Sequence, residues 1–156
     1  MDIILLTTAA ITLLKPFLTK SGEKIAEAIG EDFYKKVKGL FKKKADNQLL
    51  EKAETGPVAP EEVTAIEETL KQELPANPLL QARLTEQLNL TPANTAMVQN
   101  TLRNIQKLRT EIGQLNEEYV DAGVGTVGDY KNKIAQQERK LNEQESKLYH
   151  LIYKPA

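Results

Sequence analysis

The sequence lacks cysteine and tryptophan altogether, and it contains one histidine, His150, among 156 residues. Without cysteine there is no disulfide, no thiolate zinc site and no cysteine nucleophile. A single histidine excludes a three-histidine metal site, and a Ser-His-Asp triad would depend on His150 alone. The absence of cysteine also fits a reducing cytoplasm. We therefore expect a cytoplasmic protein, with membrane association as an open option.

Strand patterns are missing as well, and aromatic residues make up only 5% of the chain. No segment alternates apolar and polar residues in the way that half-buried strands do. Apolar residues instead recur at steps of three and four, which indicates helices. We predict an all-α protein, with a compact helical bundle over residues 1–90 and a long antiparallel coiled-coil hairpin over residues 91–156.

The net charge is close to zero, at −1, but the charged residues are unevenly distributed along the chain. Residues 15–44 contain nine lysines and four acids, whereas residues 45–91 contain nine acids and three bases. Residues 92–156 are nearly balanced. This segregation favours self-association or a charged protein partner over bulk binding of nucleic acid.

The N-terminal run IILLTTAAITLL predicts a first helix over residues 3–14, capped by Asp2. Thr8, Thr12 and Lys15 form a narrow polar stripe on an otherwise apolar helix, and such helices are normally buried. Pro16 is expected to kink or end it. The run is shorter than the roughly 20 residues that a spanning helix needs, and no basic region precedes it. A buried helix is the better interpretation.

A second, basic amphipathic helix is predicted over residues 21–44. Its apolar face comprises Ile25, Ile29, Phe33, Val37, Leu40 and Phe41, and the lysines around it are Lys35, Lys36, Lys38, Lys42, Lys43 and Lys44. One interpretation is a core helix with solvated lysines. The other is a face that binds a partner or anionic lipid, acting together with the 3–14 helix after a conformational change.

Prolines and capping residues mark later helix starts. Pro60 begins one helix, and Asn77-Pro78 and Thr91-Pro92 each place a capping residue before a proline, which is the favoured order at a helix N-terminus.

From Thr91 onward the apolar residues follow a heptad. Val98, Ile105, Ile112 and Tyr119 recur every seven residues, and a second seam contains Ile134, Leu141 and Leu148. Such spacing is typical of coiled coils, and arms of roughly 27 residues would be about 40 Å long. Gln137 and Gln144 occupy seam positions where leucine is expected; polar seam residues lower stability but fix register or partner choice.

The stretch Gly123-Val-Gly125-Thr-Val-Gly128 spells the dinucleotide pattern G-x-G-x-x-G. That pattern needs a preceding strand, and here a heptad helix precedes it. A phosphate loop would also need Lys-Ser/Thr where Asp129-Tyr130 stands. We interpret residues 122–128 as the turn of the hairpin, in which Gly123, Gly125 and Gly128 reverse the chain and Thr126 with Asp129 forms a capping box for the next helix.

No other motif indicates catalysis. The glutamate pairs at 61–62, 67–68 and 117–118 point in different directions on a helix and are expected to be solvated. His150 has no identifiable partner and is expected on the surface. We predict no catalytic residue, no metal site and no cofactor, and therefore no enzyme.

The segments IILLTTAAITLLKPFLTKSGEKIAEAIGEDFYKKVKGLFKKK and EEVTAIEETLKQELPANPLLQARL resemble small helical bacterial proteins and N-terminal modules associated with signalling or defence. The resemblance covers about residues 1–90 and implies a bacterial, cytoplasmic, non-enzymatic adaptor. The expected function is protein–protein interaction or assembly, with self-association favoured. The alternative is a membrane-acting effector that uses helices 3–14 and 21–44, in pore formation or lipid binding.

Overall fold

The computed structural model describes residues 1–121 and 127–153, and within them every regular element is a helix. The prediction of an all-α protein is confirmed. The elements are α1 (Ile3–Thr19), α2 (Lys24–Val37), α3 (Lys44–Lys52), α4 (Pro60–Glu73), the short 3₁₀ helix η1 (Leu74–Ala76), α5 (Pro78–Leu88), α6 (Thr95–Asp121) and α7 (Val127–Ile152).

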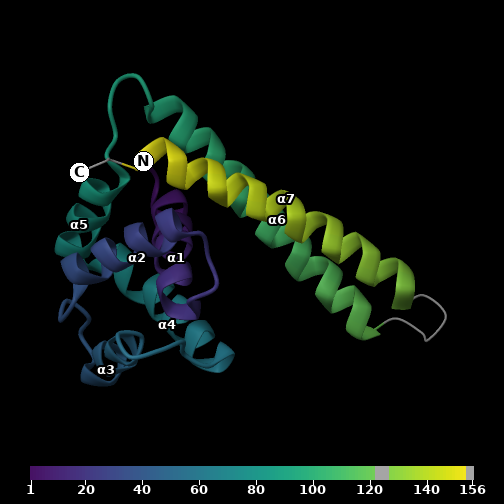
Figure 1. The fold of residues 1–156 in the computed structure, drawn as a ribbon, viewed down its shortest axis with the longest axis horizontal. Coiled ribbons are helices and arrows are strands. Elements are labelled where there is room, and N and C mark those ends of the chain that lie inside the picture. Colours follow the sequence, from purple (N-terminus) through teal and green to yellow (C-terminus); the bar gives the residue numbers. More distant parts are fainter. Residues whose placement is uncertain (122–126, 154–156) are drawn as a thin grey trace.

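Helix α1 packs against α2, α4, α5 and α6, and it lies among the helices of the bundle in Figure 1. Asp2 caps its N-terminus by accepting a hydrogen bond from the Leu5 amide at 3.0 Å. Residues on nearly every side of the helix are buried, including the hydroxyl-bearing Thr8 and Thr12. A helix that is apolar almost all round can be covered only in this way.

Pro16 does not end α1, contrary to the prediction of a helix over residues 3–14. The helix continues to Thr19 and ends at Lys20, whose φ of 55° is left-handed. Proline lacks the amide that would donate to the carbonyl four residues earlier, which is the carbonyl of Thr12. The Tyr149 hydroxyl of α7 donates to that oxygen at 2.8 Å. Tertiary structure thus replaces the hydrogen bond that the proline removes.

The predicted 21–44 helix is also shorter than expected, because α2 ends at Val37. Gly39 follows with a φ of 79°, a left-handed conformation that commonly terminates helices. Leu40 and Phe41 therefore lie in the connection to α3, where the Asn77 side chain donates to the Leu40 carbonyl at 3.1 Å.

Helices α1 and α2 cross closely at Gly30. A Cβ at this position would lie 2.6 Å from the Leu13 carbonyl oxygen and 2.9 Å from the Phe17 Cβ. The absence of a side chain therefore permits the close approach of the two helices.

The predicted starts of α4 and α5 are confirmed. Pro60 is the first residue of α4 and Pro78 the first of α5. The Asn77 side chain caps α5 by accepting from the Leu80 amide at 3.1 Å. Helix α6 starts at Thr95 rather than at Thr91, because Thr91 and Asn94 first form a turn in which each side chain bonds the other's amide.

Helices α6 and α7 run side by side in opposite directions and project from the other helices (Figure 1). They contain 27 and 26 residues, as the heptad pattern predicts. Their inner halves share the hydrophobic core with α1 to α5 through Val98, Leu102, Ile105, Leu148 and Ile152. The outer halves, residues 106–121 and 128–140, are here called the outer arm.

Candidate functional site

The predicted hairpin turn lies mostly outside the described residues. Gly123, Gly125 and Thr126 fall in the segment 122–126, which the structure does not describe. Gly128 and Asp129, predicted at the end of the turn, lie in the first turn of α7. Asp129 is well placed there, because acidic side chains stabilise helix N-termini.

The apolar residues of the predicted partner or membrane face lie in or against the core. Ile29, Phe33, Val37 and Phe41 are buried, and Ile25 and Leu40 pack against the core. The six lysines of the same segment are exposed: Lys35, Lys36, Lys38, Lys42, Lys43 and Lys44. In this conformation the six lysines face solvent, whereas the apolar face of the segment does not.

Among the described residues, no single helix has the length and apolar composition to cross a membrane. The pair α1 and α2, bent by 109°, meets that test when the two helices are taken together.

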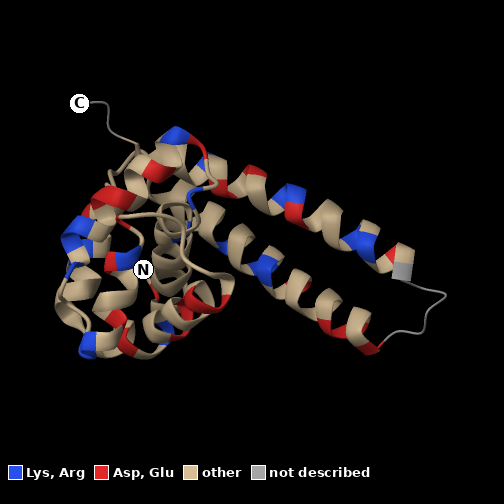
Figure 2. Ribbon diagram, turned by 60° about the horizontal axis from the view of Figure 1, so that its bottom comes forward, with Lys and Arg blue, Asp and Glu red and all other residues tan. Residues whose placement is uncertain are grey.

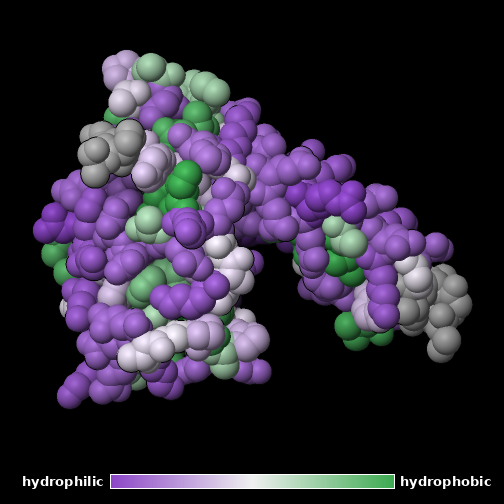
Figure 3. Space-filling model, viewed as in Figure 1, coloured by the Kyte–Doolittle hydropathy of each residue, from purple (hydrophilic) through white to green (hydrophobic). Residues whose placement is uncertain are grey.

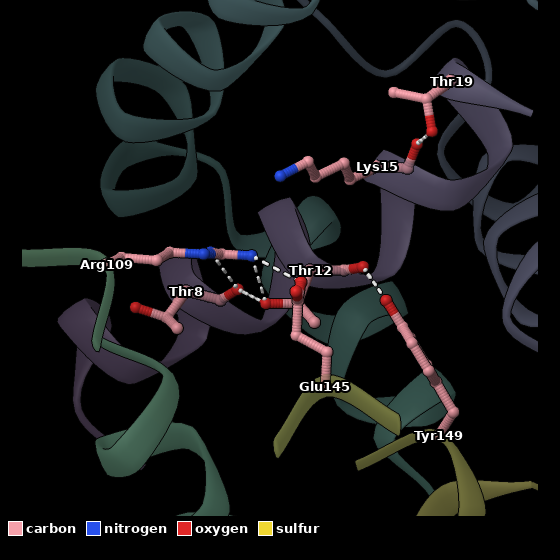
Figure 4. A network of polar contacts seen from close by, with 7 residues as sticks. All are labelled: Thr8, Thr12, Lys15, Thr19, Arg109, Glu145 and Tyr149. Carbon is pink, nitrogen blue, oxygen red and sulfur yellow. Dashed lines mark hydrogen bonds and ion pairs between the residues drawn. The ribbon is translucent and has the colours of Figure 1, made fainter. Parts of the chain in front are cut away.

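A polar junction fixes α6 and α7 to α1, as Figure 4 shows. The Arg109 guanidinium of α6 donates to the Thr12 hydroxyl at 2.8 Å and to the Thr8 carbonyl at 3.4 Å. The same guanidinium pairs with the Glu145 carboxylate of α7 at 3.2 Å. The two threonines of the predicted polar stripe are thus the binding points of the arginine on α1.

Tyr149 completes the junction one turn further along α7. Burial raises the pKa of its hydroxyl well above the ordinary value, and the nearby Glu145 carboxylate raises it further. The hydroxyl therefore remains protonated and donates to the Thr12 carbonyl. A tyrosine held in this way is a structural donor rather than a base.

The residues considered for catalysis or metal binding are not brought together. His150 is exposed, and its Nε2 lies 3.8 Å from the Glu23 carboxylate. Within residues 1–121 and 127–153, no group of three or more histidine, aspartate or glutamate side chains is arranged to hold a metal ion.

A cleft of about 1060 Å³ lies between α1 and the α6–α7 pair, and Figure 3 shows this hollow. One wall is formed by α1, including Ile4, which is 57% exposed. The opposite wall includes Ile112 of α6 and Leu141 of α7. The cleft leaves one side of the α6–α7 seam open to solvent.

The outer arm has no buried residue among those described. Its seam residues Ile112, Leu115, Tyr119 and Ile134 are only partly covered. Gln137 is also in this seam: its amide nitrogen donates to the Glu111 carboxylate at 2.7 Å, while its buried Oε1 has no hydrogen-bond partner.

Charge in the outer arm is divided between the two helices. Residues 110–121 of α6 contain four acids and no lysine or arginine. Residues 128–140 of α7 contain four bases and two acids. Figure 2 shows the acidic residues gathered at the outer end of α6 and basic residues along α7.

Sequence reasoning missed the junction. The pattern of long charged helices does not distinguish Arg109, Glu145 and Tyr149 from their neighbours. The available signal is the hydroxyl of Thr12, which lies on an otherwise apolar helix, because buried hydroxyls require hydrogen-bond partners.

Comparison of the chain with family models, with curated proteins and with solved structures gave no match.

Proposed function

We propose that the protein is a non-enzymatic interaction module, in which a helical bundle over residues 1–90 carries an antiparallel coiled-coil hairpin over residues 91–156. The outer arm is the binding surface, and its role is assembly or adaptor function, in keeping with bacterial signalling or defence. The observation that carries this proposal is the open seam of the outer arm, which lacks any buried residue among those described.

Burial of the seam side chains would provide the free energy for binding a partner. Full burial of an isoleucine or leucine side chain contributes about 1.5–3 kcal/mol to stability. Only part of that free energy is gained at the partly covered residues Ile112, Leu115 and Ile134. A helix from a partner would cover them further. Partially exposed seams of this kind are common surfaces for helical partners.

The junction supports the same proposal. Arg109, Glu145 and Tyr149 fix the base of the hairpin to α1. A binding surface that is already held in place loses less conformational freedom when a partner binds. The junction therefore presents the outer arm in a defined orientation.

Site-specific photo-cross-linking tests this proposal. A benzophenone amino acid replaces Ala135, which is exposed on the outer arm, or Ala82, which is exposed on α5 of the bundle. In cells that produce the protein, we expect protein adducts from position 135 and few from position 82. The proposal would be wrong if position 135 gave no adduct, or if both positions gave the same adducts.

The alternative is a membrane-acting effector, favoured by the combined length and apolar character of α1 and α2. It requires α1 to leave the core, which would expose side chains that are now fully buried, such as Leu13, Leu14 and Leu18. Leakage from anionic vesicles that is lost on Leu40→Asp/Phe41→Asp would support this alternative. Absence of leakage would count against it.

A further inference from the structure

We propose that the partner of the outer arm is a second copy of this chain, packed so that α6 of each copy lies against α7 of the other. This inference rests on the proposed function, since it assigns an occupant to the same surface. It specifies a closed four-helix arrangement of two hairpins related by a two-fold axis.

Charge complementarity selects this arrangement. The outer part of α6, residues 110–121, carries four acids without a base, and residues 128–140 of α7 carry twice as many bases as acids. Placing α6 beside a second α6 would bring like charges together. Placing α6 beside the other copy's α7 brings opposite charges together.

A two-fold axis repeats that favourable pairing. In an isologous dimer, a contact from α6 of one copy to α7 of the other is accompanied by the reverse contact. Both interfaces of the four-helix arrangement then combine an acidic helix with a basic one.

The charges of the outer arm are available for such contacts. Glu117, Glu118, Lys131 and Lys133 are exposed, and in the part of the chain that the structure describes, the one ion pair between α6 and α7 is Arg109–Glu145 at the base. The acids at the end of α6 are therefore not neutralised by the bases of their own α7 within ion-pair distance.

Apolar residues of the outer arm would add hydrophobic contact to the charge complementarity between the two copies. Val120 is 79% exposed at the outer end of α6, and Tyr119 and Ile134 are partly covered. A second hairpin brings apolar residues of the same kind to these positions. The open seam and the divided charge thus lie on the same part of the molecule.

Charge reversal with complementation tests the pairing. One variant carries Glu117→Lys/Glu118→Lys on α6, and the other carries Lys131→Glu/Lys133→Glu on α7. Sedimentation equilibrium between about 1 µM and 1 mM covers the affinity range of such contacts. We expect the unchanged chain to dimerise and each variant alone to dimerise at least about tenfold more weakly. An equimolar mixture of the two variants should recover the affinity, because both α6–α7 contacts are attractive in the mixed dimer.

The control is Lys36→Glu/Lys43→Glu, which makes the same charge change as the α7 variant, but at exposed positions of the bundle, and should leave dimerisation unchanged. Circular dichroism of each variant shows whether its helices are retained, and recovery on mixing excludes simple unfolding as the cause of weakened association.

Two outcomes would overturn the inference. If the unchanged chain is a monomer throughout the concentration range, no second copy occupies the arm, while adducts from position 135 to another protein would keep the proposed function. If the chain dimerises but the mixed variants do not recover affinity, the α6-to-α7 pairing is wrong.

Discussion

The hydrogen bond from Tyr149 to the Thr12 carbonyl provides the sharpest test of the fold. Pro16 leaves this carbonyl without its helical amide donor, Tyr149 supplies a hydroxyl at 2.8 Å, and Thr12 is fully buried. Tyr149→Phe keeps the ring but leaves a buried acceptor unsatisfied, which costs about 1–3 kcal/mol. For a chain of this size, each kcal/mol lowers Tm by about 2–4 °C.

The proline supplies the matched background for this measurement. In Pro16→Ala, the alanine amide can donate to the Thr12 carbonyl in the ordinary helical way. Tyr149→Phe should then cost well under about 1 kcal/mol, so the double-mutant cycle should give a coupling of about 1 kcal/mol or more. Urea unfolding followed by circular dichroism, at one chain concentration for all variants, measures the four free energies of unfolding.

Tyr153→Phe is the control, because Tyr153 is 43% exposed and should change stability by less than about 0.5 kcal/mol. Equal costs of Tyr149→Phe in the proline and alanine backgrounds would refute the assignment of the tyrosine as the replacement donor.

The same residue predicts a loss of stability in alkali. The pKa of Tyr149 is raised in the folded chain, whereas an unfolded tyrosine titrates near about 10. Its contribution to stability is therefore complete below about pH 10 and falls as the pH rises above that value. In urea titrations from about pH 9 to 11, the fall should be smaller for Tyr149→Phe. An equal fall in both proteins would contradict this prediction.

Three further sets of substitutions are each tested by urea unfolding. Gly30→Ala should lower the free energy of unfolding by about 1–3 kcal/mol, because the added Cβ would meet the α1 backbone. Gly113→Ala, in open space on α6, should raise the free energy of unfolding by about 0.5–1 kcal/mol, and effects of the same sign at the two positions would contradict this reasoning. Arg109→Met should cost about 2–3 kcal/mol by leaving Glu145 unpaired, and adding Glu145→Leu should recover most of that loss; no recovery would mean that the pair is not the cause. Gln137→Leu should stabilise the chain by about 1 kcal/mol, because the buried amide oxygen of Gln137 has no hydrogen-bond donor. A loss of stability would show that the hydrogen bond from Gln137 to Glu111 contributes more than the unpaired oxygen costs.

Local chemistry explains which parts of the fold were predictable from the sequence. Pro60 and Asn77-Pro78 start helices through interactions within a few residues, and the heptad spacing predicts the lengths of α6 and α7. These signals depend on neighbours along the chain, so the sequence displays them directly.

Where the predictions differ from the structure, the cause is either a tertiary contact or a local backbone conformation. Pro16 fails to end α1 because its missing hydrogen bond is replaced from α7, and no local rule contains that partner. The predicted 21–44 helix is too long because the apolar spacing continues past Gly39, whose left-handed conformation follows the end of α2. The ion pair of Arg109 with Glu145 was missed because charged residues on long helices are usually solvated.

The dependence of α1 on Tyr149 also has a consequence for synthesis. The hydroxyl and the Thr12 carbonyl are 137 residues apart, and chains grow at about 5–20 residues per second. The most apolar helix therefore emerges roughly 7–27 seconds before the residue that satisfies its open carbonyl. During that interval the apolar surface of α1 is not covered by α7, and α1 reaches its final hydrogen bonding only when α7 has been made.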